Sequence, residues 1–131
     1  MEKDCFVTAV LMYGARRYFG EAERYSEELV AQNPSAQTLY GTRGSILVVN
    51  GRLDEGIAML ERLHRESSSV IDQTISSTFL ALGEFKRNNL EQAAQWLEQA
   101  KQLGEDYPCI DLVERVIKPK TELQPSVHST S

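Results

Sequence analysis

One helical pattern occurs three times in this chain of 131 residues, and the repetition constrains the fold more than any other feature. In each copy a large apolar residue is followed three positions later by a small residue and seven positions after that by another apolar residue. The copies are Phe19, Ala22 and Leu29; Leu53, Gly56 and Leu63; and Leu90, Ala93 and Ala100. Other apolar residues recur at three- and four-residue spacings, which is the stripe of an amphipathic helix. The small residue is expected to let a neighbouring helix approach closely.

A second helical stretch precedes each copy, and short polar segments separate the pieces. The preceding stretches are 3–17, 36–50 and 70–87. Residues 45–49 have strand propensity, but Gly51 is a typical helix C-cap and the repeat register favours a helix there. Six alternating helices joined by short turns are expected to pack as antiparallel neighbours.

The spacing between copies is not constant, because the small residues are 34 and then 37 positions apart. Ser69 and Asp72 fit a capping box, which would open the helix 70–87 early and add nearly one turn to it. A longer loop through the serines of 67–69 is the alternative. We expect the longer helix.

A last helix is predicted for 108–118, with Pro108 at a position where prolines start helices. Its apolar side consists of Ile110, Leu112, Val113, Val116 and Ile117. Such a helix would cover the apolar face that the end of a helical stack exposes. The segment 119–131 has few apolar residues, so we predict a disordered tail there.

These helix pairs resemble the tetratricopeptide repeat, a unit of 34 residues. The matching family positions are Phe6, Tyr13, Phe19, Ala22 and Pro34; Tyr40, Gly44, Gly51, Leu53, Gly56 and Leu60; and Leu80, Ala81, Leu90, Ala93, Leu97 and Ala100. Departures from the pattern are Val10, Arg43, Ser77 and Glu84. The resemblance covers 3–118 and implies an all-α solenoid, a right-handed superhelix of antiparallel helix pairs. Its expected parts are repeats 3–36, 37–73 and 74–107 and a capping helix 108–118.

Charge and composition exclude several partners. The chain has 14 Lys and Arg against 19 Asp and Glu, a net charge of −5, and it lacks a basic stripe, so we expect no binding of nucleic acid. No apolar run approaches the ~20 residues that span a bilayer, so we expect no membrane insertion. Cys5 and Cys109 form no CxxC pair and are interpreted as free thiols of a cytoplasmic protein.

The sequence offers no combination of residues that is typical of catalysis. His64 has no second metal ligand or nucleophile at a suitable spacing, and we interpret it as a surface histidine. Gly14, Gly20, Gly41 and Gly44 fall within a helical register rather than in a phosphate-binding loop. We therefore expect no enzyme activity, no metal site and no cofactor.

In the tetratricopeptide family the first helices of the pairs line a concave groove that binds peptides. The resemblance implies that groove contacts here come from Val7, Leu11, Thr38, Thr42, Arg43, Ser45, Phe79, Leu82, Phe85 and Lys86. The Lys and Asn clamp that holds a C-terminal carboxylate in one subgroup is absent. The mostly uncharged groove favours a protein or peptide partner with apolar residues.

Two features of this groove have alternative interpretations. Phe79, Leu82 and Phe85 could equally be buried against the capping helix or another subunit. Arg43 stands at a normally apolar position between helices, where it needs a carboxylate or carbonyl groups. We expect a structural pairing there, and a groove anchor is the alternative.

The functional hypothesis is a non-catalytic protein-interaction module, either an adaptor or a chaperone-like binder. One alternative is a homo-oligomeric assembly protein, such as a homodimer, in which a second copy covers the groove. Another is a fragment of a longer repeat array.

Overall fold

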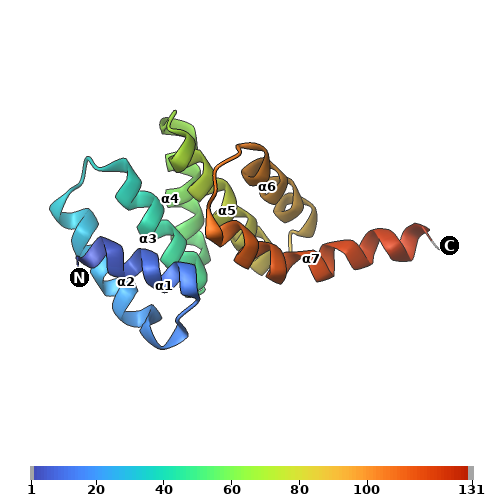
Figure 1. The fold of residues 1–131 in the computed structure, drawn as a ribbon, viewed down its shortest axis with the longest axis horizontal. Helices are drawn as coiled ribbons and strands as arrows, with labels where there is room; N and C mark the ends of the chain where they lie inside the picture. Colours follow the sequence, from blue (N-terminus) through green and yellow to red (C-terminus); the bar gives the residue numbers. More distant parts are fainter. Residues whose placement is uncertain (1, 130–131) are drawn as a thin grey trace.

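A computed structural model describes the backbone of residues 2–129 and the side chains of residues 2–120. Within this part of the chain the protein is all-α, with seven α-helices, one short 3₁₀-helix η1 and no strand. The helices are α1 (Lys3–Tyr13), η1 (Arg16–Tyr18), α2 (Phe19–Gln32), α3 (Gln37–Val49), α4 (Leu53–Glu66), α5 (Val70–Lys86), α6 (Leu90–Gln102) and α7 (Pro108–Ser129). The all-helical prediction is confirmed (Figure 1).

Helices that follow one another in the chain pack against one another, and so do alternate helices. Three consecutive pairs are in contact, α1 with α2, α3 with α4 and α5 with α6. The alternate helices α1, α3, α5 and α7 also contact one another in series. In addition α7 contacts α1, so the last helix reaches back to the first (Figure 1).

The centre of the molecule is formed by α3 and α5, which are covered by helices on several sides. All residues from 41 to 48 in α3 are buried, and so are all residues from 76 to 84 in α5. Hydroxyl side chains are tolerated here because they donate to carbonyls of their own helix: Thr78 Oγ1 lies 2.7 Å from the Thr74 carbonyl oxygen. The exception is Ser77 of α5, whose buried Oγ has no hydrogen-bond partner.

The three small residues of the repeated pattern are all buried, as the pattern predicts. At Gly56 an added Cβ would lie 2.9 Å from both the Val48 amide nitrogen and the Gly44 carbonyl oxygen. At Gly44 it would lie 2.9 Å from the Leu60 side chain. The backbones of α3 and α4 are therefore as close as two glycines allow.

The helices α1, α3 and α5 end in the same way. A residue with positive φ follows each helix end, and the next amide donates to the carbonyl five positions back, which is a Schellman motif. The positive-φ residues are Gly14, Gly51 and Asn88. The corresponding bonds are Ala15 N to Val10 O, Arg52 N to Leu47 O and Asn89 N to Glu84 O.

This motif corrects the prediction for the first repeat. Gly14 has φ of 60° and ends α1, so the predicted helix over 3–17 is four residues too long and Gly14 is not within a helical register. Residues 15–18, which include η1, connect α1 to α2, whereas single residues follow Gly51 and Asn88. Tyr13, assigned to a packing position, is 83% exposed as a result.

The extra residues before the third copy lengthen a helix, as expected. Helix α5 has 17 residues and α3 has 13. The predicted capping box is wrong, because the Ser69 side chain makes no capping hydrogen bond. Asp72 instead accepts from Ser67 Oγ at 2.8 Å and from Thr38 Oγ1 at 3.1 Å, which ties the start of α5 to α3.

Helix α7 begins at Pro108, as predicted, and packs against α5 and α6. Ile110, Val113 and Ile117 are buried, in keeping with a helix that covers the last pair. The helix extends to Ser129, beyond the predicted end at residue 118. The disorder predicted for 119–131 falls mostly on residues whose side chains lie outside the described part, and it stays a prediction.

Candidate functional site

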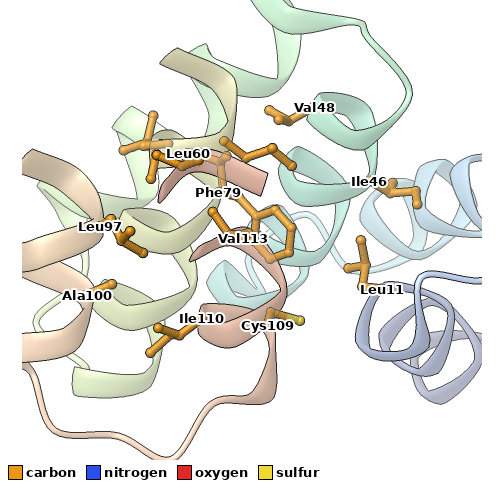
Figure 2. Close-up of a cluster of buried hydrophobic side chains, with 14 of the residues drawn as sticks. Leu11, Ile46, Val48, Leu60, Phe79, Leu97, Ala100, Cys109, Ile110 and Val113 are labelled. Carbon is orange, nitrogen blue, oxygen red and sulfur yellow. The ribbon is translucent and has the colours of Figure 1, made fainter. Parts of the chain in front are cut away.

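Four of the five apolar residues assigned to the groove lie in the core, because α7 packs against the helices that were expected to line it. Val7 is fully buried, and Leu11, Phe79 and Leu82 are each less than a tenth exposed. Figure 2 shows Phe79 in the middle of this cluster, with Val113 of α7 beside it and Leu11 facing it from α1. The alternative of packing against the capping helix therefore describes Phe79 and Leu82.

The polar residues assigned to the groove mostly bond within the helical scaffold. Ser45 is fully buried and donates to the Gly41 carbonyl at 2.6 Å. Thr42 Oγ1 lies 3.4 Å from both an Asp4 carboxylate oxygen and the Thr38 carbonyl. Thr38 itself is exposed, but its hydroxyl donates to Asp72. All of these hydrogen bonds are made within the chain, and none of them involves a partner protein.

Arg43 takes part in a structural pairing with α2, as the sequence analysis expected, and does not face a groove. Its guanidinium donates to the Glu23 carbonyl at 3.3 Å and to Ser26 Oγ at 3.2 Å. The Glu27 carboxylate lies 3.6 Å away. This side chain holds α3 to α2, and the groove-anchor interpretation is wrong.

An open hollow lies where the C-terminal parts of α1, α3 and α5 meet the first half of α7. It has a volume of about 430 Å³, and we call it the α1/α7 hollow. Its lining residues are Leu11, Gly14, Arg16, Phe19, Val49, Phe79, Leu82, Lys86, Cys109, Leu112, Val113 and Val116. Four of the residues predicted for the groove, Leu11, Phe79, Leu82 and Lys86, thus lie on its walls.

The wall of the hollow includes exposed apolar surface. Val116 is 49% exposed, and Leu112, Val49 and Phe19 are half-buried. These residues come from three separate helices, so only the folded chain brings them together. Large exposed apolar side chains around a concavity are typical of a binding site.

Two cations stand at the hollow. Lys86 donates to the carbonyl oxygens of Val48 at 3.0 Å and Val49 at 2.8 Å at the end of α3, where the Val48 carbonyl also accepts from the Gly51 amide. Burial, followed by repulsion from Arg16, lowers the pKa of Lys86. Phe85, also predicted for the groove, is half-buried, and Lys120 lies 5.7 Å from the centre of its ring.

The ionisable groups nearest the core show no nucleophilic character. Burial raises the pKa of the Cys109 thiol, which keeps it protonated at neutral pH, and a thiol is a far weaker nucleophile than a thiolate. Burial also raises the pKa of its neighbour Tyr107 well above the usual value. Cys5 is a free thiol at the surface.

His64 is more enclosed than predicted. Its ring lies between α4, α5 and α6, with Nδ1 3.2 Å from Ser76 Oγ and Nε2 3.3 Å from the Gln99 side chain. The Trp96 ring meets it edge-on at 4.9 Å. The surface interpretation is wrong, because the ring is half-buried and contacts side chains of α5 and α6, and this desolvation lowers the pKa of His64. Residues 2–120 hold no group of three or more His, Cys, Asp or Glu side chains placed to bind a metal ion.

Sequence reasoning missed Arg16 and Phe19 as parts of the site and assigned Leu112 and Val116 only to capping. One signal was present in the sequence. The apolar side of α7 is wider than a single contact with the last pair requires, since Leu112 and Val116 lie beside the buried Val113 and Ile117.

Among the described residues, every helix is too short or too polar to cross a bilayer. No protein-family model, curated protein or solved structure matches this chain.

Proposed function

We propose that this chain is a non-catalytic protein-interaction module, adaptor-like or chaperone-like, that binds an apolar segment of a partner protein in the α1/α7 hollow. The observation that carries this proposal is the apolar wall of the hollow, which remains open to solvent at Val116. A volume of about 430 Å³ lies in the usual range for ligand sites. Burial of one apolar side chain there contributes roughly 1.5–3 kcal/mol.

In this proposal the three helix pairs form a superhelical stack like that of the tetratricopeptide repeat. The serial contacts of α1, α3 and α5 support such a stack. The partner binds near the C-terminal ends of α1, α3 and α5, because α7 already covers the apolar face around Phe79. The free thiols Cys5 and Cys109 support a reducing compartment such as the cytoplasm.

Selection from a random peptide display library against the purified chain tests this proposal. The affinities of selected peptides are then measured by fluorescence anisotropy for the wild type and for Val116→Gln. Val70→Gln is the matched control, because Val70 is 47% exposed on α5, almost the same as Val116, but does not line the hollow. Both substitutions should leave the unfolding free energy within about 0.5 kcal/mol.

We expect Val116→Gln to weaken peptide binding about tenfold, the equivalent of one apolar side chain losing part of its burial. Val70→Gln should leave the affinity unchanged. Failure to select any peptide, or equal affinities for both variants, would contradict the proposal. Light scattering on the same samples covers the alternative of a homodimer: a dimer that Val116→Gln dissociates would replace the peptide by a second copy.

A further inference from the structure

The walls of the α1/α7 hollow carry a charge opposite to that of the whole chain. The chain has a net charge of −5, yet the lining residues include two cations, Arg16 and Lys86, and no Asp or Glu. The charged residues among the lining of the hollow are therefore all positive. A third cation, Lys120, lies over the ring of Phe85, and Phe85 directly precedes Lys86 in α5.

Lys86 and Arg16 differ in how many of their N–H groups have hydrogen-bond partners. Lys86 uses two of its three N–H groups on the carbonyls of Val48 and Val49, which fixes the ammonium at the end of α3. Among the described side chains, the Arg16 guanidinium has no hydrogen-bond or ion-pair partner. It is instead repelled by Lys86. Two like charges beside apolar surface favour the approach of an anion.

A purely apolar segment would fit this site poorly. On filling the hollow it would remove water from around Arg16 without giving the guanidinium a partner, which is costly for a charged group. A carboxylate on the same segment would accept hydrogen bonds from the guanidinium, whose planar fork matches a carboxylate in two-point contacts. The positive charge of the hollow therefore favours apolar segments that carry a carboxylate over apolar segments that do not.

Building on the proposed function, we propose that the segment bound in the α1/α7 hollow carries an Asp or Glu beside its apolar side chains, and that Arg16 pairs with this carboxylate. Lys86 supports the pairing through its positive charge, while its own N–H groups hold α3. The occupant is an acidic-apolar peptide segment of another protein.

The test uses peptides from the display selection and a double-mutant cycle on the full chain. Each Asp or Glu of a selected peptide is changed to Asn or Gln, and its affinity is measured for the wild type, Arg16→Gln and Arg17→Gln. Arg17 is the matched control, since it is the next residue in η1 but stacks over the Tyr18 ring at 5.3 Å and does not line the hollow. Lys86 is left intact because its loss would also remove its hydrogen bonds to the Val48 and Val49 carbonyls of α3.

We expect the selected peptides to be enriched in Asp or Glu next to apolar residues. Arg16→Gln should weaken their binding about fivefold, and removal of the critical carboxylate should then cost nothing further in this variant. Binding to the wild type should weaken as salt concentration rises. Arg17→Gln should bind like the wild type.

The inference is overturned if the selected peptides lack acidic residues. It is also overturned if Arg16→Gln binds the selected peptides as tightly as the wild type does. If Val116→Gln still weakens such peptides, the hollow remains the binding site and only the charge selection fails. If neither substitution matters, the proposed function fails as well. A dimer of the chain that depends on Arg16 would assign the hollow to a second copy and also overturn the inference.

Discussion

The centre of the molecule is closely packed, whereas the region around the α1/α7 hollow is open. Between α3 and α4 the backbones touch at Gly44 and Gly56, and no space remains for a single methyl group. The α1/α7 hollow, in contrast, leaves about 430 Å³ of open space between the helices, and an added Cβ on Gly14 would meet nothing within 4 Å. Both regions contain glycine, but for different physical reasons.

This difference separates the parts of the chain that hold the fold from those free to bind a partner. In the centre, side chains fill the space between helices, so substitutions act on stability through packing. At the hollow, Val116 and Arg16 face open space, so substitutions there should act on binding. Three changes test this contrast, beginning with the largest expected effect.

Gly56→Ala should lower the free energy of unfolding by about 3 kcal/mol, at the upper end of overpacking costs. The reason is that the new methyl group would meet backbone atoms of α3, which cannot rotate away as a side chain can. Urea denaturation followed by circular dichroism measures the loss. Gly20→Ala in α2 is the control, because no atom lies within 4 Å of its added Cβ, and it should be neutral or slightly stabilising. A Gly56→Ala chain as stable as Gly20→Ala would contradict the close approach.

Gly14→Ala should cost about 1–2 kcal/mol, for a reason that involves only the backbone. The φ of 60° is strained for alanine, although space is available around it. Gly14→Asn should cost less, since asparagine tolerates this conformation and Asn88 occupies the equivalent end of α5. The same urea experiment compares the two variants. Equal losses for Ala and Asn would indicate crowding rather than backbone strain at this end.

The smallest effect is expected for His64, as a pH dependence of the free energy of unfolding. Burial lowers its pKa in the folded state, so the unfolded chain binds more protons below about pH 6.5 and the unfolding free energy falls as the pH drops through that value. His64→Gln should reduce this loss. Unfolding is measured at pH 7.5 and pH 5.5 for both chains. An unchanged difference between the two pH values would exclude His64 as a contributor.

Most of the helical organisation could be predicted because it depends on local periodicity. The stripes around Ala22, Gly56 and Ala93 fix the faces of α2, α4 and α6, and their small residues are buried as expected. The end of α1 was misplaced because the register was set by the second helices of the pairs. Gly14, Gly51 and Asn88 are evenly 37 positions apart, and this spacing was hidden by the different lengths of the connections that follow them.

The candidate site was predicted only in part. Leu11, Phe79, Leu82 and Lys86 do lie together, because residues on one face of neighbouring helices share a surface. Their exposure depends on where α7 docks, and helix periodicity contains no information on docking direction. Arg16 escaped notice for the same reason, since nothing near it in the sequence indicates that it approaches Lys86 of α5.

The sequence by itself determined an acidic, all-helical chain of paired helices with small residues where the helices meet, because apolar periodicity and residue size act locally. The tertiary structure alone decided that α7 returns to α1, covers Phe79 and leaves the α1/α7 hollow open beside Arg16. The physical reason is that a hollow and its charge arise from the relative placement of segments between α1 and α7 that are distant in the sequence. Each element satisfies its own helical pattern equally well whether or not such a hollow exists.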